Sequence, residues 1–515
     1  MKKWLCAFAI ASIVVFLAPS VRAADSVCVN ETGFCFSTIQ AAIDSATAGQ
    51  HVIITDNGLY NENLSIGKGI YIWSNSTNGY PTIYKDNVTL INAYSNNLRL
   101  RGVIINSTGT ADNIYAIYSA SGGSPELLLE NVAMYVNMSG TDSGGVFHIS
   151  ATCNTDNLNV TSSGLKYPVL YCAGGTVNNS RFTGPSTFTY YVWFAYGAVT
   201  VTNTVINTTS TTAVGLVGYR ANTYDNVTVI TGGASPINTG DDQSSLTISN
   251  SYVQNTLTGG SPAVYLYGPA TIINTTIVGG YYGIDSYYST AKNYTFTITN
   301  VSVSGHGASE ALRLLPQTDY LNTTVNINNS TILPSQLAES CNALRPCYVN
   351  FSSYLDVTVT DSDGSAISGA SVNVTDSAGT TQSSTTTGSS GTISRLTLRY
   401  ANVTYAASNA LTWHTNHTIL AYMANRSNNQ SSNNLSASAS LTKVLYLNLS
   451  QSPMYCGFFG QTTCDDEIKV LGAQSANRRA EGRREEYKWR SRCGGFQPSV
   501  SGPRRRVCSL ALRRR

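Results

Sequence analysis

Residues 246–253 read L-T-I-S-N-S-Y-V, and residues 270–277 read A-T-I-I-N-T-T-I. In each stretch, apolar and polar residues alternate up to an asparagine, and an apolar residue stands three positions after it, as Val253 does after Asn250. Alternation of this kind predicts short strands, and asparagine tolerates the left-handed backbone of a tight bend. Both stretches therefore predict the same unit, made of a strand, a bend and a second strand.

This unit recurs nine times along the chain. Successive asparagines lie 22 to 29 residues apart, with a mean of about 25, which leaves room for three short strands and three turns in each repeat. A repeat of this size cannot enclose a core alone and must stack on its neighbours. The asparagines are Asn131, Asn157, Asn179, Asn203, Asn226, Asn250, Asn274, Asn300 and Asn329, and Gly102 is expected at the same place in an earlier repeat.

The stacked repeat predicts an all-β fold, a right-handed parallel β-helix. Successive coils would lie about 4.8 Å apart. Each asparagine amide would then reach the amide one coil away, so we expect a structural ladder of nine amides inside the turn. Asn226, Asn274, Asn300 and Asn329 are also glycosylation sequons, and burial in the ladder would keep them unmodified.

Residues 35–73, which begin C-F-S-T-I-Q-A-A-I-D-S-A, resemble the N-terminal segment of the pectin-lyase-like family of parallel β-helix proteins. An apolar stripe predicts a short amphipathic helix there, with a capping box at Ser37 and Gln40 and a stop at Gly49. The resemblance implies that this helix covers the open end of the stack, where strands would otherwise expose an unpaired edge. It concerns the fold rather than any activity.

The composition excludes several other classes of protein. Charged residues make up 11% of the 515 residues, against roughly 25% in an average globular protein, whereas hydrophobic residues reach 42%. The polarity must come from uncharged side chains, which argues against a coiled coil or a helical bundle. Residues 1–467 carry a net charge of −8 and residues 468–515 one of +11. We expect no nucleic-acid partner for the acidic body.

The N-terminus and the cysteines indicate export. Residues 1–23 contain two lysines, an apolar run and a V-R-A cleavage site, which predicts a signal peptide, a secreted or cell-surface protein and no transmembrane segment after cleavage. Close cysteine pairs in an exported chain predict disulfides, and the lack of nearby histidine argues against zinc. The pairs are Cys28 with Cys35, Cys153 with Cys172, Cys341 with Cys347, and Cys456 with Cys464.

A change of period after Cys347 predicts a second domain. Alternating apolar and polar residues, with turns at short intervals, indicate a small β-sandwich. The stretch from Val357 to Leu398 resembles immunoglobulin-like modules of the carboxypeptidase regulatory-domain type. The predicted segments are a signal peptide (1–23), an N-terminal cap with the helix (24–60), the β-helix (61–335), a cysteine-containing linker (336–352), the β-sandwich (353–450), a cysteine loop (451–467) and a basic tail (468–515), either disordered or a misread end of the coding sequence.

One strand of each coil, ahead of the asparagine, carries the predicted functional face. Its outward residues form a column with many aromatic side chains, which can stack against sugar rings. The column predicts a glycan-binding face, with an extracellular glycan or another surface protein as the partner. A slip of one residue in the alignment would turn a member inward. The predicted column is Tyr118, His148, Tyr171, Phe194, Leu216, Asn238, Leu266, Asp285 and Arg313.

An enzymatic interpretation is the alternative. Members of the family that resemble polygalacturonases combine N-T-D, D-D and G-H-G motifs, and this chain has N-T-G-D-D at 238–242 and G-H-G at 305–307. The two motifs would lie on the order of 12 Å apart along the stack, too far to act on one substrate.

A resemblance to calcium-dependent pectate lyases instead implies that Asp241, Asp242 and Asp285 hold a calcium ion and that Arg313 acts as the base. Apart from that calcium, the sequence predicts no metal and no cofactor. We therefore expect a non-catalytic structural or glycan-binding surface protein, and as the alternative a polysaccharide lyase or glycoside hydrolase that acts on an extracellular polysaccharide.

Overall fold

The computed structural model describes most of the chain between residues 26 and 447. The predicted signal peptide, the pair of Cys456 and Cys464, and the basic tail lie outside the described residues. Within 26–447, the residues not described are 95–96, 120–125, 141–143, 164–168, 185–190, 213, 242–243, 258, 289–292, 318–321, 407, 424–425 and 434–440.

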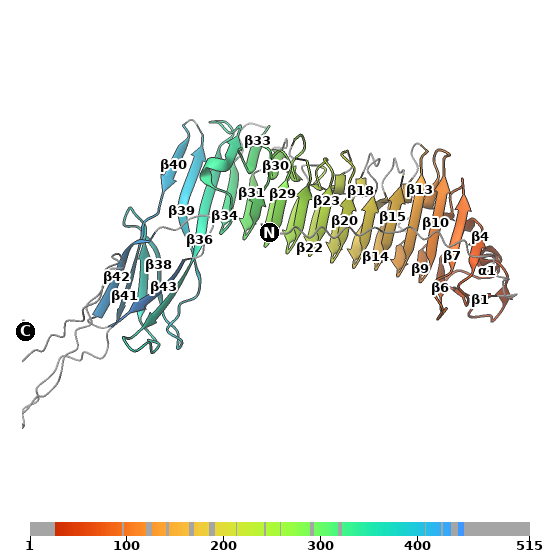
Figure 1. Ribbon diagram of the computed structural model, residues 1–515, viewed down its shortest axis with the longest axis horizontal. Coiled ribbons are helices and arrows are strands. Elements are labelled where there is room, and N and C mark those ends of the chain that lie inside the picture. Colours follow the sequence, from red (N-terminus) through yellow and green to blue (C-terminus); the bar gives the residue numbers. More distant parts are fainter. Residues whose placement is uncertain are drawn as a thin grey trace, which may run out of the picture. The chain divides into compact units, whose positions relative to one another are not determined.

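The described chain is almost wholly β and winds as a parallel β-helix, in which each coil contributes one strand to each of three sheets (Figure 1). Sheet 1 contains β5 (Leu64–Ile66), β8 (Ile91–Ala93), β11 (Tyr115–Ser119), β14 (Gly144–Asp156), β16 (Leu170–Asn178), β18 (Tyr191–Ala195), β21 (Val214–Gly218), β24 (Ile237–Asn238), β27 (Val264–Leu266), β30 (Ile284–Tyr288), β33 (Leu312–Pro316) and β35 (Leu337–Glu339). Sheet 2 contains β3 (His51–Ile54), β6 (Ile70–Ser74), β9 (Leu98–Arg101), β12 (Leu127–Glu130), the ends of β14 and β16, β19 (Val199–Thr202), β22 (Ala221–Asp225), β25 (Ser245–Ser249), β28 (Ala270–Ile273), β31 (Tyr294–Thr299), β34 (Thr323–Asn328) and β36 (Cys347–Thr360). Sheet 3 contains β4 (Leu59–Asn61), β7 (Thr82–Asp86), β10 (Ile104–Gly109), β13 (Ala133–Met138), β15 (Asn159–Ser163), β17 (Arg181–Gly184), β20 (Val205–Thr208), β23 (Thr228–Thr231), β26 (Tyr252–Asn255), β29 (Thr276–Gly279) and β32 (Ser302–Ser304).

The core is a single apolar column that runs through the stack of coils. Every second residue of a strand points inward, and each fully buried large apolar side chain stabilises the fold by roughly 1.5–3 kcal/mol. The apolar residue three positions after each ladder asparagine is buried in all nine coils, as predicted. These residues are Met134, Val160, Phe182, Ile206, Val229, Val253, Ile277, Val303 and Ile332.

All nine ladder asparagines occupy a left-handed bend at the end of a sheet 2 strand, and in the first eight a strand of sheet 3 follows. Their φ angles lie between 45° and 55°, and Gly102 takes the same position with φ 66°. The backbone N–H of each asparagine donates to a carbonyl of the next coil, as Asn226 does to Ser249 at 3.0 Å. Only glycine, and at some cost asparagine, adopts this conformation readily. The bend therefore fixes where each coil turns relative to the next.

The side-chain ladder is continuous, but two neighbouring positions build it. Five links join one ladder amide to the next, with nitrogen–oxygen distances of 2.7 to 3.2 Å. In the other three links, the acceptor is the residue just before the ladder asparagine of the previous coil. Asn179 donates to Asp156, Asn203 to Asn178, and Asn250 to Asp225. Hydrogen bonds from Ser249 and then Asn250 hold the pKa of the Asp225 carboxyl below its usual value.

The prediction that the amides lie inside the turn is wrong. Seven of the nine asparagines are exposed, and Asn131 and Asn329 are half-buried. The next residue fills the inside of the bend instead, and five times it carries a buried hydroxyl (Ser180, Thr204, Ser251, Thr275 and Ser330). Ser251, for example, donates to the carbonyl of Ser249 and accepts the N–H of Val227. Burial therefore gives the exposed ladder sequons Asn226, Asn274 and Asn300 no protection from glycosylation.

A short helix covers the N-terminal end of the stack, as predicted. It is α1 (Ile39–Ser45), and its apolar residues are buried. The helix begins after Thr38, whose hydroxyl accepts the N–H of Ala41, and the Glu62 carboxylate accepts the N–H groups of Ile39 and Gln40 at 2.9 Å. The predicted capping box of Ser37 and Gln40 is therefore replaced by Thr38 and a carboxylate from the first coil. The helix also ends four residues before Gly49.

The predicted disulfides within the described residues are present. One joins Cys28 in β1 (Val27–Val29) to Cys35 in β2 (Cys35–Phe36), beside the helix. The others are Cys153 with Cys172, which links two coils inside the core, and Cys341 with Cys347.

The boundaries of the solenoid differ from the predicted ones. It begins at β3, inside the predicted cap, and residues 336–352 form its last coil rather than a linker. In that coil, β35 pairs in parallel with β33, and the first part of β36 pairs in parallel with β34. This last coil does not bend at the ladder position, because β36 continues as one strand from Cys347 to Thr360.

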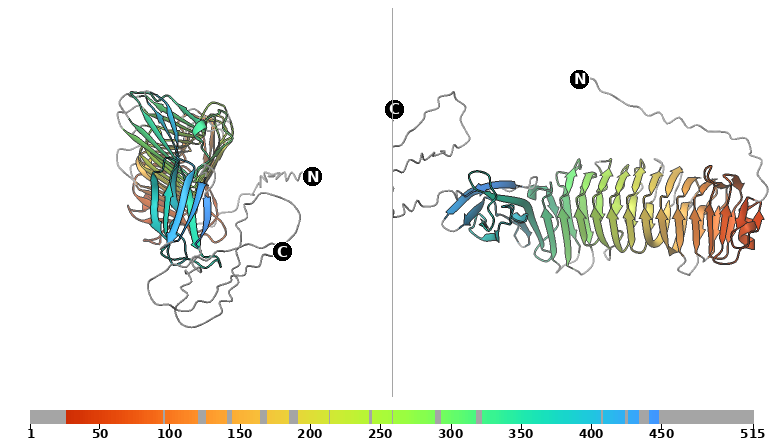
Figure 2. Two further views of the ribbon diagram at one scale, coloured as in Figure 1. Left: turned by 90° about the vertical axis from the view of Figure 1, so that its left-hand side faces the viewer. Right: turned by 90° about the horizontal axis from the view of Figure 1, so that it is seen from below.

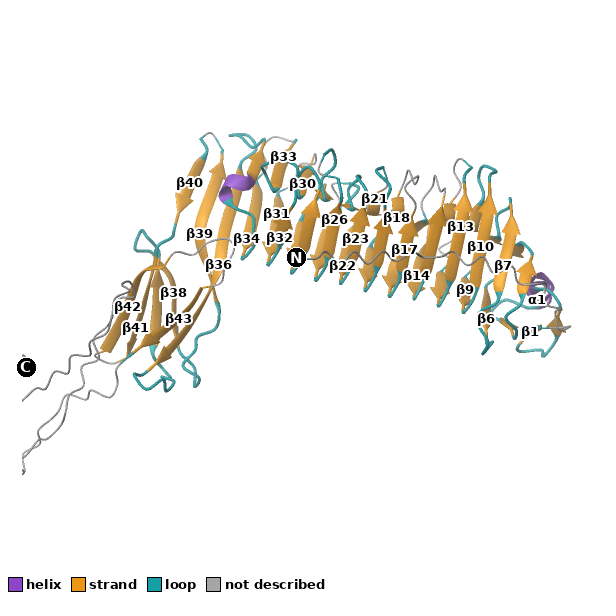
Figure 3. Cartoon of the chain, in the orientation of Figure 1, coloured by secondary structure: helices purple, strands orange, loops and turns teal. Residues whose placement is uncertain are grey.

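The second part of β36 belongs to the small β-sandwich (Figure 3). Its residues 355–360 pair with β43 (Leu441–Tyr446), whereas β39 (Leu396–Tyr405) pairs with β36 along residues 347–355 and so also borders the last coil. β40 (Ala410–Trp413) pairs with β39. The facing sheet consists of β38 (Thr381–Thr386), β37 (Ser371–Thr375), β41 (His417–Met423) and β42 (Arg426–Asn433).

A single turn of 3-10 helix, η1 (Pro334–Gln336), precedes β35. Neither helix of the described part is long and apolar enough to span a membrane.

The ladder gives a first testable prediction. Asn250 donates to Asp225 and accepts from Asn274, and it sits at φ 51°. Asn250→Gly loses the two hydrogen bonds and should lower the free energy of unfolding by about 1 kcal/mol. Asn250→Ala adds the strain of a left-handed alanine and should cost about 2 kcal/mol. Urea titrations followed by circular dichroism measure both.

The matched control is Asn61→Ala. Asn61 is exposed at the end of β4 and makes no side-chain hydrogen bond within the described part of the chain. Its replacement should change stability by less than about 0.5 kcal/mol. Equal effects of Asn250→Ala and Asn61→Ala would contradict the structural role of the bend.

Candidate functional site

The strand register corrects the predicted column in three coils. Pairing in sheet 1 places Tyr118, Phe147, Tyr171, Phe194, Val217, Asn238, Tyr265, Asp285 and Arg313 side by side. His148, Leu216 and Leu266 are therefore each one position out of register, and Leu216 and Leu266 are buried in the core. Two consecutive apolar residues stand at each of these places, so alternation alone could not decide which one points inward.

The corrected column does not form an open aromatic surface. Val217 and Asp285 are buried, and the members Tyr118, Tyr171, Asn238, Tyr265 and Arg313 are half-buried. The side chains of Phe147, His148 and Phe194 lie outside what the structure describes. The residues predicted to bind glycan are thus mostly the supporting layer of a surface that begins further along the same strands.

A row of tyrosines lies two residues beyond the column, where sheet 1 ends. It comprises Tyr196, Tyr219, Tyr267 and Tyr287, and we call it the tyrosine row. Backbone bonds set its register, since Tyr219 donates to the carbonyl of Ala195, the residue before Tyr196. The ring centroids of Tyr196 and Tyr219 are 5.6 Å apart, and those of Tyr267 and Tyr287 are 5.7 Å apart. The corrected column and the tyrosine row follow the same strands, two residues apart.

Residues of the predicted column support the row from below. The Tyr171 ring meets the Tyr196 ring edge-on, with centroids 5.6 Å apart, and the Tyr265 ring meets the Tyr267 ring at 4.8 Å. Edge-to-face contacts of this kind favour one arrangement of the rings. The outer tyrosines are therefore held in place before any ligand arrives.

Gly240 fills the one position of the row that lacks a tyrosine. Its φ is 75°, and a Cβ atom added there would lie 2.8 Å from the ring of Tyr219, so the absence of a side chain lets that ring lie over the backbone. The turn is fixed by Asn238, whose side chain accepts the N–H of Gly240 at 2.7 Å. Buried Ser244 donates to the carbonyls of Thr239 and Gly218.

The row is uncharged near neutral pH. Burial, and then the neighbouring phenols, raise the pKa of Tyr219 above its ordinary value. Burial and a hydrogen bond with Tyr267 raise the pKa of Tyr265 as well. The Tyr219 and Tyr265 phenols therefore keep their protons, and a phenol of this kind can both donate and accept a hydrogen bond.

The residues of the alternative enzymatic interpretation form an ion pair instead of a reactive centre. Arg313 Nε donates to Asp285 Oδ1 at 2.8 Å, and its Nη2 donates to Oδ2. The guanidinium also lies 4.3 Å above the Tyr282 ring. The hydrogen bond with Asp285 raises the pKa of Arg313, which keeps this side chain protonated and unsuited to act as a base.

The predicted calcium ligands are not brought together as a free acidic cluster. Arg313 occupies both oxygens of Asp285, and Asp241 bonds to Ser244 and to Arg220. Asp242 lies outside the described residues. Within the part of the chain that the structure describes, no three His, Cys, Asp or Glu side chains gather as metal ligands would. His306 of the G-H-G motif bonds to the carbonyl of Ala308 in its own loop.

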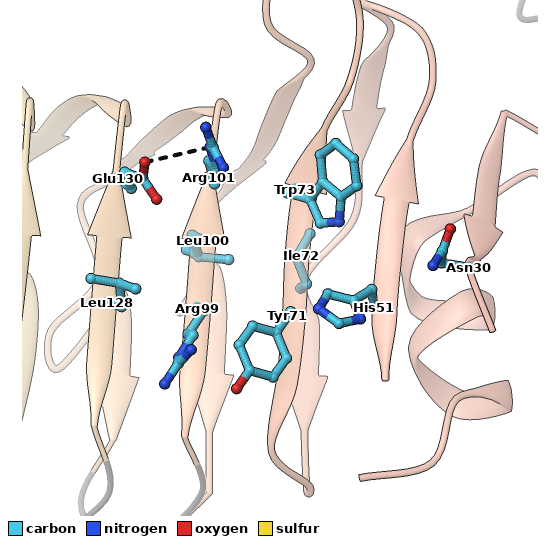
Figure 4. Close-up of a pocket in the computed structure, with 10 residues that line it drawn as sticks. All are labelled: Asn30, His51, Tyr71, Ile72, Trp73, Arg99, Leu100, Arg101, Leu128 and Glu130. Carbon is cyan, nitrogen blue, oxygen red and sulfur yellow. Dashed lines mark ion pairs between the residues drawn. The ribbon is translucent and has the colours of Figure 1, made fainter. Parts of the chain in front are cut away.

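A second surface feature lies on the first coils and has no counterpart in the sequence predictions (Figure 4). It is an open groove of about 350 Å³ on the outer side of sheet 2, and we call it the N-terminal groove. The predicted functional face lies on a different strand of each coil, so no residue of sheet 2 is among the predicted binding residues. The lining residues are Asn30, His51, Tyr71, Ile72, Trp73, Arg99, Leu100, Arg101, Leu128 and Glu130.

The comparisons with known proteins add no relative. No family model, no curated protein and no solved structure matches the chain. The function must therefore be argued from the residues of the two surface features.

The ion pair of Asp285 and Arg313 gives a second prediction. Asp285 is only 1% exposed, so Asp285→Ala should leave the half-buried guanidinium of Arg313 without its partner. We expect the free energy of unfolding to fall by about 3 kcal/mol, measured by urea titration. Asp363→Ala, at an exposed turn, should change it by less than about 0.5 kcal/mol.

A calcium titration distinguishes a structural role of Asp285 from a role as a metal ligand. If this residue is structural, adding calcium should not change the midpoint of thermal unfolding of the unsubstituted protein. A midpoint that rises with calcium concentration, and no longer does so in Asp285→Ala, would show that Asp285 is a metal ligand.

Proposed function

We propose that this protein is a secreted or cell-surface glycan-binding protein that holds a polysaccharide along its coils without cleaving it. The proposal rests on the tyrosine row. The signal-peptide pattern of residues 1–23 and the resemblance of residues 35–73 to pectin-lyase-like proteins favour an extracellular, carbohydrate-related role. The resemblance of the C-terminal sandwich to carboxypeptidase regulatory modules fits a spacer on such a surface protein.

The chemistry of the row suits a sugar chain. A tyrosine ring offers an apolar face for the C–H groups of a pyranose and a phenol for its hydroxyls. The rings repeat at the spacing of the coils, about 4.8 Å, which is similar to the length of one sugar unit in an extended polysaccharide. A chain lying parallel to the axis of the stack would therefore meet rings at successive units on Tyr196 and Tyr219 and again on Tyr267 and Tyr287, with a gap of one unit over Gly240.

The absence of charge favours a neutral polysaccharide. The row itself is uncharged, and the nearest charged groups on this surface are the pairs Arg220 with Asp241 and Asp285 with Arg313. Each pair is internally compensated. Among the described residues, a polyanionic chain would find along the row only cations that are already paired, which favours a neutral chain.

The test is a binding assay of the full mature chain on immobilised and soluble polysaccharides, both neutral and acidic. We expect at least one neutral polysaccharide to bind, and Tyr196→Ala, Tyr219→Ala and Tyr267→Ala each to weaken its affinity about fivefold to tenfold. The matched control is Tyr135→Ala. Tyr135 lies on sheet 3 and is 48% exposed, and Tyr196 is 49% exposed. The two variants therefore remove equally exposed rings from different positions on the surface.

Two results would contradict the proposal. One is an affinity that falls equally in Tyr196→Ala and Tyr135→Ala, which would show that the row has no special role. The other is the release of new reducing ends or unsaturated sugars, with loss of that activity in Arg313→Ala, which would support the lyase or hydrolase alternative.

A further inference from the structure

We propose that the N-terminal groove is a separate saccharide site, which binds a single uncharged pyranose residue against Trp73. The proposal stands on its own contacts and does not depend on the tyrosine row. The groove lies on sheet 2 of the first coils, whereas the row lies at the end of sheet 1 in later coils.

Register places an aromatic ring, a cation and a carboxylate in one line across three coils. Trp73 in β6 pairs with Arg101 in β9, which pairs with Glu130 in β12. Successive members of the line are about 4.8 Å apart. A sugar ring stacked on Trp73 would therefore have a donor and an acceptor within reach of its hydroxyls, as Figure 4 allows the reader to follow.

Trp73 is the ring that remains available in this groove. The neighbouring Tyr71 ring is already covered, because His51 lies 4.8 Å from it and the Arg99 guanidinium lies 4.5 Å above it. Trp73 is half-exposed and has no aromatic, cationic or hydrogen-bonding side-chain partner among the described residues. Its ring offers an apolar platform, and its indole N–H offers a donor.

The hydrogen-bonding capacity of Arg101 and Glu130 is also only partly used within the described part of the chain. In the described part of the chain, the side chain of Arg101 has a single contact, from its Nε to the Glu130 carboxylate at 3.5 Å, which is too long for a hydrogen bond. The Arg101 side chain is 62% exposed. A hydroxylated ligand can therefore bond to the guanidinium and the carboxylate without breaking an existing strong contact.

The charges of the groove favour a neutral ligand. Arg101 lies beside Glu130, Arg99 donates to Glu126, and His51 bonds to Glu31. Each arginine is thus matched by a carboxylate, and a uronate would meet those carboxylates as well as the arginines. The volume of about 350 Å³ is at the small end for ligand sites and suits one sugar residue better than a long chain.

The experiment is a saturation-transfer NMR titration of the full mature chain with D-glucose, D-galactose, D-mannose, N-acetyl-D-glucosamine, D-glucuronate and D-galacturonate. At least one of the four neutral sugars should bind saturably and also change tryptophan fluorescence. Trp73→Ala should weaken that binding at least tenfold, and Arg101→Gln and Glu130→Gln about fivefold each. Trp413→Ala, which removes an exposed tryptophan of the sandwich, should leave it unchanged.

The other outcomes would overturn the proposal. These are the failure of all four neutral sugars to saturate, tighter binding of a uronate, and unchanged affinity in Trp73→Ala. If Trp73→Ala does not fold, as judged by thermal unfolding, the exposed substitution Arg101→Gln decides the question. Tyr219→Ala should not affect this titration, so failure of the groove and failure of the tyrosine row can be told apart.

Discussion

The structure depends on the left-handed bend that every ladder coil makes at its asparagine. The bend ends the strand of sheet 2 and starts the strand of sheet 3 at the same place in each coil, and its N–H bonds to the next coil. Because side chains alternate between the two faces of a strand, one residue of drift would exchange core and surface. A fixed bend prevents that drift, and it explains why loops of unequal length between the strands do not disturb the stack (Figure 2).

Fixed register is also what creates surface rows from a single repeated position. The tyrosine row and the N-terminal groove both consist of residues that lie far apart in the sequence and adjacent in neighbouring coils. Tyr196 and Tyr219 meet because their strands pair, and Trp73, Arg101 and Glu130 form a line for the same reason. A solenoid thus presents a ligand surface that extends along its axis, and substitutions at one column position change that surface without changing the core.

The sequence carried enough information for the fold and less for the site. The period, the asparagines with their apolar followers, the helical cap and three disulfides could be predicted, because each depends on local spacing. The direction of the amides could not, because spacing does not distinguish the inside of a bend from its outside. Buried hydroxyls such as that of Ser251 occupy the inner side of the bend, and no pattern in the sequence predicted them.

The site predictions failed where neighbouring residues were chemically alike. Val146 and Phe147, or Leu216 and Val217, are both apolar, so only strand pairing shows which one faces the core. The supporting layer was therefore mistaken for the surface. The groove was not predicted because its residues lie on sheet 2, whereas the predicted binding face lies only on the strands that form sheet 1. The identity of a sugar is not encoded in any of these patterns.

Disulfide trapping in sheet 2 tests the register most directly. Thr200 pairs with Thr223 on the outer side of adjacent coils, at a separation of about 4.8 Å that a disulfide can bridge. The double substitution Thr200→Cys with Thr223→Cys should form that bond on mild oxidation, as detected by peptide mapping. Thr202→Cys with Thr223→Cys, two residues out of register and more than about 7 Å apart, should not. Equal cross-linking of the two pairs, or a bond only in the second, would contradict the register on which both surface features depend.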